Sequence, residues 1–175
     1  FVGRYHELEQ LDAWLHSELR LLFLVGPAGI GKTALADRFV ADASKRMRTA
    51  FYPAWPSEPR PGLGAVGLLV IDGIDGPHAG DKRLLEALAR HDRDSRTHLL
   101  LVGRSLPQAI PPGLLEGVYS VLTLGGLGYE DSLGVLEMAG QGGYLSKQTL
   151  ELVISWAEGF PAVLKALAAQ LDSRE

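Results

Sequence analysis

The chain has 175 residues, of which 46% are hydrophobic and 22% charged, and its formal net charge is −4. This is an ordinary globular composition, and the acidic balance argues against a dedicated surface for nucleic acid or anionic membranes. The absence of cysteine excludes disulfides and thiolate metal sites, and the five histidines form no cluster with metal-ligand spacing. No apolar run approaches the roughly 18 residues that span a bilayer, and no signal peptide opens the chain. We therefore expect a cytoplasmic protein without a membrane partner.

Strands and helices are predicted to alternate over the first 124 residues. Leucines spaced by three and four predict an amphipathic helix over 5–19. A short apolar run predicts a buried strand at 21–25, and a helix follows over 32–44. Further strands are predicted at 49–53, 67–72, 97–105 and 118–124, with a proline- and glycine-rich loop at 54–67 and a helix at 81–91. Such alternation is typical of an α/β fold with a parallel sheet flanked by helices.

The pattern changes after Leu124. Glycines introduce three predicted helices, at about 129–139, 146–157 and 161–171, and Pro161 suits the first turn of the last helix. We expect a nucleotide-binding core over 1–124 and a small helical lid over 125–175. The chain opens on Phe1 instead of methionine, so we also expect it to be one module of a longer multidomain protein.

One motif has the composition of a phosphate cradle. Gly26-x4-Gly31-Lys32-Thr33 lies between a predicted strand and a predicted helix, which is the order that a phosphate loop requires. In such a loop backbone N–H groups bind phosphates, Lys32 neutralises the β- and γ-phosphates, and Thr33 ligates Mg²⁺. The expected nucleotide-binding residues of this loop are Gly26, Pro27, Ala28, Gly29, Ile30, Gly31, Lys32, Thr33 and Ala34.

Three further side chains follow predicted strands. Asp72 ends a buried strand, where open α/β sheets bind ligands, and would hold Mg²⁺ with Thr33. Asp75 is the nearby carboxylate that could orient an attacking water, and it could equally be a solvated loop residue. Arg104 follows the fourth strand, where it is either a sensor of the γ-phosphate or a surface arginine. With Lys32, these three are the candidate catalytic residues.

The order of the motifs resembles the STAND class of signalling P-loop ATPases, nearest to its NACHT and related bacterial AAA-like branches. The resemblance rests on FVGRYHELEQL, GPAGIGKTAL, LLVIDGID, LLLVGRS and EGFPAVLKALA, which together span nearly the whole chain. It implies a five-stranded sheet of order 5-1-4-3-2. It also implies that Val2, Gly3 and Arg4 lie beside the adenine and ribose, that Pro161 rests on the base, and that Arg104 is the sensor.

The same resemblance implies a molecular switch. ADP would hold a closed resting state, ATP would drive self-association through the full-length protein and its other domains, and Mg²⁺-dependent hydrolysis would be slow. Gly76 stands where many NACHT members have a second acidic residue, and the segment between the second and third strands lacks the usual helix. Two alternatives remain: a DNA-handling ATPase resembling archaeal origin-binding proteins, although no nucleic-acid partner is expected from the charge, and a nucleotide-binding scaffold without turnover.

Overall fold

The computed structural model describes residues 1–53, 66–75, 96–107, 119–139 and 146–172. These residues form two compact units. The sheet unit contains His6–Gly26 and Lys32–Thr123, and the lid unit contains Phe1–Tyr5, Pro27–Gly31 and Leu124–Glu175. Most of the phosphate loop therefore groups with the lid unit, although the strand before it and the helix after it belong to the sheet unit.

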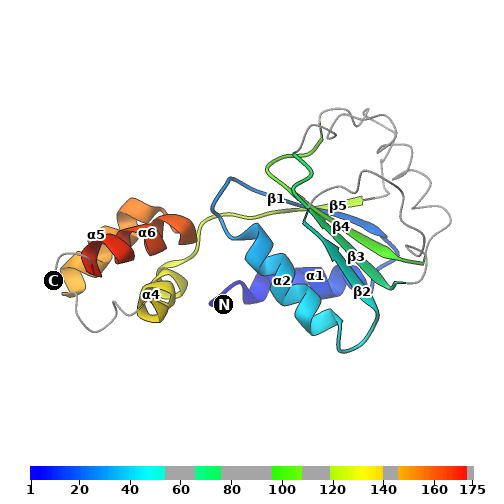
Figure 1. The fold of residues 1–175 in the computed structure, drawn as a ribbon, viewed down its shortest axis with the longest axis horizontal. Coiled ribbons are helices and arrows are strands. Elements are labelled where there is room, and N and C mark those ends of the chain that lie inside the picture. The colour runs from blue at the N-terminus through cyan, green and yellow to red at the C-terminus, as the bar shows by residue number, and fades with distance from the viewer. Residues whose placement is uncertain (54–65, 76–95, 108–118, 140–145, 173–175) are drawn as a thin grey trace. The chain divides into compact units, whose positions relative to one another are not determined.

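A five-stranded parallel sheet forms the sheet unit (Figure 1). Its strand order is β2-β3-β4-β1-β5, which is the predicted order 5-1-4-3-2 read from the opposite edge. Register places Leu21 of β1 beside Leu99 of β4 and Tyr119 of β5. The strands are β1 (Leu21–Val25), β2 (Thr49–Tyr52), β3 (Leu68–Asp72), β4 (His98–Gly103) and β5 (Tyr119–Thr123). The predicted fold class is confirmed, and so is the second strand, which pairs with β3.

The central strands are buried on both faces. Every residue of β1 and β4 is buried, as are the first four residues of β3. Parallel strands covered on both faces need continuous apolar runs instead of alternation, which is why these three segments were recognisable in the sequence. One core cluster gathers side chains from β1, β3 and β4, and it includes Ile74 from the loop after β3. The core thus extends to the edge of the sheet at which the candidate site residues lie.

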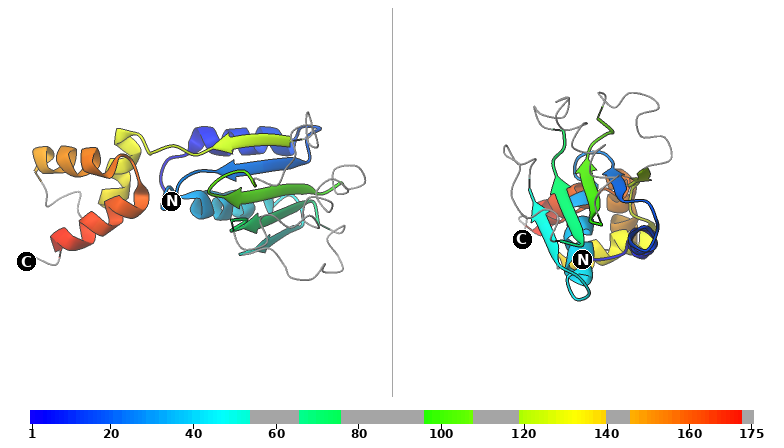
Figure 2. Two further views of the ribbon diagram at one scale, coloured as in Figure 1. Left: turned by 90° about the horizontal axis from the view of Figure 1, so that it is seen from above. Right: turned by 90° about the vertical axis from the view of Figure 1, so that its right-hand side faces the viewer.

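Two helices lie on the same face of the sheet (Figure 2). They are α1 (Tyr5–Leu15) and α2 (Lys32–Ala43), and their contact includes Trp14 and Phe39, whose ring centroids are 6.5 Å apart. Helix α1 ends four residues earlier than predicted. Ser17 explains the early end, because its hydroxyl donates to the Trp14 carbonyl and accepts from the Leu19 amide, replacing helical hydrogen bonds.

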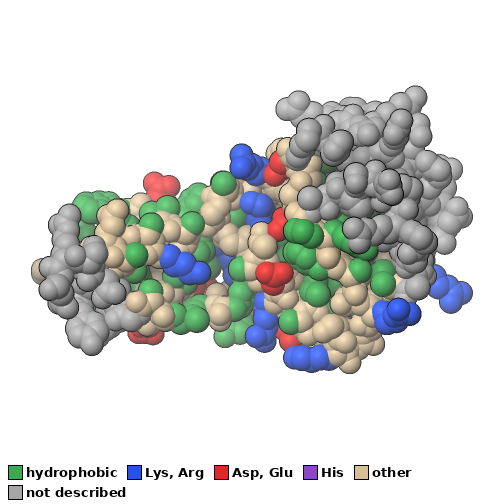
Figure 3. Space-filling model, viewed as in Figure 1, with side chains coloured by type: hydrophobic (Ala, Val, Ile, Leu, Met, Phe, Trp, Pro, Cys, Tyr) green, Lys and Arg blue, Asp and Glu red, His purple; other side chains and the backbone are tan. Residues whose placement is uncertain are grey.

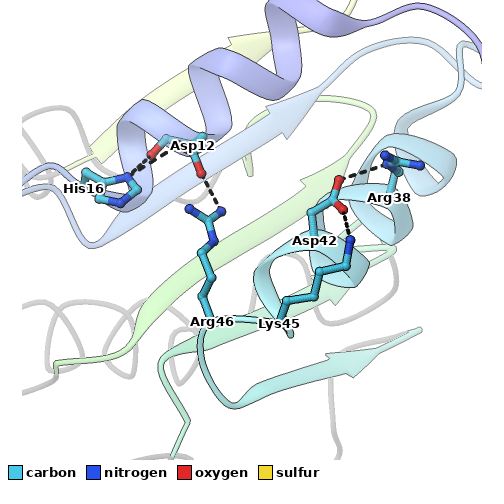
Figure 4. A network of polar contacts seen from close by, with 6 residues as sticks. All are labelled: Asp12, His16, Arg38, Asp42, Lys45 and Arg46. Carbon is cyan, nitrogen blue, oxygen red and sulfur yellow. Dashed lines mark hydrogen bonds and ion pairs between the residues drawn. The ribbon is translucent and has the colours of Figure 1, made fainter.

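Exposed ion pairs lie along these helices, and one of them joins α1 to the residues after α2 (Figure 4). Arg46, just after α2, donates to Asp12 of α1 at 2.6 Å. Asp42 accepts from Arg38 at 2.9 Å and from Lys45 at 2.8 Å. Because these side chains are exposed, the ion pairs contribute little to stability compared with the buried contact between the helices.

The described residues of the lid unit form three helices around a second apolar core. They are α4 (Tyr129–Met138), α5 (Lys147–Ala157) and α6 (Pro161–Asp172), close to the predicted ranges. Ser146 caps α5 by accepting from the Thr149 amide, and Glu158 and Gly159 take positive φ where α5 ends. Figure 3 shows hydrophobic side chains on the visible surface of these helices, and the exposed large ones are Tyr129, Met138, Leu152, Trp156 and Val163.

Some predictions fall outside the described residues. The predicted helix at 81–91, residue Gly76 and most of the predicted loop at 54–67 are among them. Within the described part of the chain, no helix is long and apolar enough to cross a membrane.

Candidate functional site

The phosphate loop connects the buried strand β1 to the first turn of α2. Gly29 and Gly31 have φ angles of +79° and +99°, which side chains with a Cβ rarely adopt. Between them, the side chain of Ile30 is fully buried and anchors the loop. Gly31, which the motif requires, therefore lies where the backbone takes a left-handed conformation, and Gly29 within the loop does so as well.

Lys32 folds back over the loop. Its Nζ atom donates to the carbonyl oxygen of Gly26 at 2.8 Å, so the ammonium closes the turn between the first and last glycines of the motif. Burial lowers the pKa of Lys32 below its ordinary value, whereas the carboxylates of Asp75 and Asp72 act to raise this pKa. Arg104 lowers the same pKa, which places its charge within electrostatic reach of Lys32. Lys32 is thus within electrostatic reach of the other three candidate catalytic side chains.

Thr33 and Asp72 lie in direct contact. The Thr33 hydroxyl donates to Asp72 Oδ2 at 2.6 Å, and Asp72 Oδ1 accepts from the Gly73 amide at 2.7 Å. A hydroxyl and a carboxylate are hard oxygen donors, which suit Mg²⁺. Among the described residues no group of three or more His, Cys, Asp or Glu side chains could hold a metal. This donor pair fits a magnesium ion that takes its remaining ligands from phosphate and water, as nucleotide-bound Mg²⁺ does.

Asp75 contacts the end of the neighbouring strand. Its two carboxylate oxygens accept from the backbone N–H of Arg104 at 2.8 and 2.7 Å. This contact depends on the pairing of β3 with β4, which no local sequence pattern signals. The candidate residues of the sheet unit therefore include two hydrogen-bonded pairs, Thr33 with Asp72 and Arg104 with Asp75, and the charges of Asp72, Asp75 and Arg104 act on Lys32.

The lid unit places the start of α6 against the loop. The Ala162 amide donates to the Gly29 carbonyl at 3.3 Å. A Cβ on Gly31 would lie 3.7 Å from Cγ of Pro161, whereas a Cβ on Gly29 would lie only 2.9 Å from that of Ala162. Pro161 is the first residue of α6, as predicted, and it lies beside the phosphate loop.

Arg4 is buried and holds two backbone segments of the lid unit together. One guanidinium nitrogen, Nη2, donates to the Ile30 carbonyl at 3.2 Å and to the Gly125 carbonyl at 2.6 Å. The backbone of Arg4 has a φ of +62°, an unusual conformation for a residue with a side chain. The bond to Ile30 brings this arginine to the phosphate loop, and the bond to Gly125 was not foreseen.

The residues before Arg4 pack against α4. A Cβ on Gly3 would overlap the carboxyl group of Asp131, and a Cβ on Gly134 would lie 2.7 Å from Val2. No pattern local to these segments signals the two contacts, since each joins residues that are more than a hundred positions apart. Val2, Gly3 and Arg4 thus share one unit with Pro161 and with residues 27–31 of the loop.

Comparisons with known proteins support the fold. No family model matches the chain, and no curated protein matches it. Among solved structures, the chain is similar to RuvB of Thermotoga maritima: two point variants give TM-scores of 0.68 and 0.66 at 19% and 20% identity. A third RuvB structure, described as a Holliday junction branch migration motor, gives 0.62 at 19%. In all three comparisons, 99% of this chain aligns with 63% of the RuvB chain. This chain therefore spans less than two thirds of the length of RuvB. The chain therefore has the fold of the matched part of RuvB.

Proposed function

We propose that this chain is the nucleotide-binding module of an ATPase and that it holds ATP or ADP with Mg²⁺ at the phosphate loop. Backbone N–H groups of residues 26–33 bind the phosphates, assisted by the positive end of the α2 dipole. Lys32 leaves the Gly26 carbonyl to meet the β- and γ-phosphates. Thr33 and Asp72 hold the metal, which when bound neutralises the charge that develops on the phosphates.

The contact between Thr33 and Asp72 is the observation that carries this proposal. The two residues are 39 positions apart in the sequence, yet a 2.6 Å hydrogen bond joins them at the carboxyl edge of the sheet. Open α/β sheets bind ligands at this edge. A glycine-rich turn of purely structural origin needs no carboxylate beside its threonine, whereas a magnesium nucleotide site does.

Titration with ATP in the presence of Mg²⁺ or of EDTA tests this assignment. We expect the wild-type protein to bind ATP more tightly with Mg²⁺. Thr33→Ala and Asp72→Asn should lose most of that gain while keeping the affinity measured in EDTA. Ser44→Ala and Asp37→Asn, which change exposed polar groups in or just after α2, are the controls. An unchanged gain in both site variants contradicts the proposed metal site.

The biological role that we propose for this module is a nucleotide-dependent switch of the STAND type. A lid that touches nucleotide in only one state lets ADP and ATP select different conformations. Two features support it: the opening VGR segment shares a unit with loop residues 27–31 and the start of α6, and α6 contains no arginine. A motor-type AAA ATPase usually has an arginine near that point to contact the γ-phosphate. Hydrolysis is then slow and resets the switch.

The state of the purified natural protein tests the switch. We expect the protein to release ADP on denaturation. In light scattering, we expect a small species with ADP and a self-associated species with a non-hydrolysable ATP analogue. An identical molar mass with both nucleotides contradicts the switch and favours a scaffold that binds without turnover. Single-turnover kinetics with labelled ATP then separates slow hydrolysis from none.

A DNA-handling ATPase is the second candidate, and the likeness to RuvB favours it. The net charge of −4 favours the switch instead, because DNA-binding proteins carry basic surfaces that neutralise phosphates. Titration with a fluorescent four-way junction and with a duplex, at low salt with ATP, distinguishes the two. Salt-sensitive binding stimulated by ATP would favour the DNA role over the switch.

A further inference from the structure

The loop after β3 is fastened to the end of β4 at two successive positions. The Ile74 amide donates to the Val102 carbonyl at 3.1 Å, and the Arg104 amide donates to both oxygens of Asp75. The Ile74 side chain is buried in the core of the sheet unit. Residues 74–75 and 102–104 thus form one connected element, which we call the strand-end clamp.

Gly103 permits the close approach within the strand-end clamp. A Cβ at this position would lie 2.5 Å from Cγ1 of Ile74 and 3.0 Å from Oδ1 of Asp75. Any side chain at position 103 would push the Asp75 carboxylate away from the amide of the next residue. The hydrogen bond from Arg104 to Asp75 is exposed, but it depends on the close approach of Gly103 to Ile74 and Asp75 at the ends of β3 and β4.

Arg104 is the last residue of the strand-end clamp. Its side chain is exposed, and its charge acts on the ammonium of Lys32 in the phosphate loop. An exposed arginine side chain loses rotational freedom when it binds a ligand. A backbone that is already held in place reduces the conformational entropy that must be lost on binding. Holding the Arg104 amide with a carboxylate also sets the direction in which the side chain leaves the sheet, and a hydrogen bond to an ionised group is among the stronger ones.

We propose that Asp75 is a positioning residue that fixes Arg104 for contact with the γ-phosphate, in place of the water-orienting role considered from the sequence. This inference rests on the proposed function, because it requires a nucleotide at the loop. Both carboxylate oxygens are directed at the backbone of Arg104. Asp75 thereby lets the site distinguish ATP from ADP through Arg104.

A double-mutant cycle on nucleotide discrimination tests this role without requiring turnover. The quantity to measure is the ratio of the dissociation constants for ADP and for a non-hydrolysable ATP analogue, both with Mg²⁺. We expect Arg104→Ala to reduce this ratio roughly tenfold, as for loss of one charge-assisted contact. Asp75→Ala should reduce the ratio nearly as much while leaving ADP affinity unchanged. The double variant should be no worse than Arg104→Ala, because Asp75 acts through Arg104.

Conservative variants of Asp75 distinguish a positioning role from a role as the base that orients water. Asp75→Asn keeps an oxygen that can accept from the Arg104 amide, so its ratio should stay within about threefold of wild type. A base role predicts the reverse: Asp75→Asn and Asp75→Ala abolish hydrolysis equally and neither alters the ratio. Asp75→Ser, whose hydroxyl is too short to replace the carboxylate, substitutes for the alanine variant if that one misfolds. Asp37→Ala, which removes an exposed carboxylate of α2, is the control and should not alter the ratio.

The outcomes also separate this inference from the proposed function. Independent, multiplicative effects of Asp75→Ala and Arg104→Ala overturn the inference while leaving nucleotide binding in place. An Asp75→Ala variant that retains the wild-type ratio overturns it as well. Failure of the wild-type protein to bind either nucleotide overturns both.

Discussion

Replacing Arg4 tests whether the N-terminal segment stabilises the phosphate loop. Arg4→Ala removes a buried guanidinium that donates to the carbonyls of Ile30 and Gly125. A hydrogen bond to a charged group contributes about 1.5–3 kcal/mol, and the two bonds share one nitrogen, so we expect a loss of about 3 kcal/mol. For a chain of this size that corresponds to a fall of roughly 6–12 °C in Tm.

Arg4→Gly is the matched variant, because it removes the same guanidinium and also the Cβ. Arg4 has a φ of +62°, and left-handed backbone costs a residue with a Cβ roughly 1–2 kcal/mol. We therefore expect Arg4→Gly to be about 1 kcal/mol more stable than Arg4→Ala. Thermal and urea unfolding followed by circular dichroism measure both, with the exposed Arg38→Ala as the control. A loss below about 1 kcal/mol for Arg4→Ala, or the reverse order of the two variants, refutes this reasoning.

Two further predictions concern the loop and the sheet. Gly29→Val should destabilise the protein by at least about 2 kcal/mol in the same unfolding assay, because it combines a φ of +79° with a Cβ 2.9 Å from that of Ala162. Gly125→Ala, whose Cβ meets nothing within 4 Å, should be near neutral, and equal losses would contradict the packing. Burial, and the charge of Arg20 nearby, lower the pKa of His98 below 6.5 in the folded protein. The stability that neutral His98 contributes is therefore complete above about pH 6.5, and it is lost as the pH falls through the pKa of the folded state. His98→Gln should therefore lose less stability than wild type between pH 7.5 and 5.5, and parallel losses would exclude His98 as the cause.

The strands and the loop motif were predictable because their signals are local. Apolar runs such as 21–25 identify strands that are buried on both faces, and the spacing of Gly26, Gly31 and Lys32 identifies the phosphate loop without any tertiary information. The strand order 5-1-4-3-2 came from the family resemblance, since the periodicity of single strands cannot specify which of them pair.

The contacts that connect the site were not predictable in this way. The bond from Arg104 to Asp75 depends on the register between β3 and β4, and that from Arg4 to Gly125 joins segments 121 residues apart. The predicted end of α1 was wrong for a local reason. Leucine periodicity continues to Leu19, whereas the hydrogen bonds of the Ser17 hydroxyl end the helix earlier. Periodicity reports which face is apolar, whereas side-chain hydrogen bonds decide where a helix stops.

Nucleotide binding by wild type and Lys32→Ala tests the central claim most directly. Lys32 contacts the Gly26 carbonyl, and it is the one basic residue within the 26–33 loop, so its loss should remove phosphate affinity while leaving the sheet core intact. Calorimetric titration with ATP and Mg²⁺ should show saturable binding by wild type and by the exposed control Lys45→Ala. For Lys32→Ala, with an unchanged circular dichroism spectrum, it should show at least a hundredfold weaker binding, on the order of 2.7 kcal/mol. Equal affinity in wild type and Lys32→Ala would contradict the proposed site.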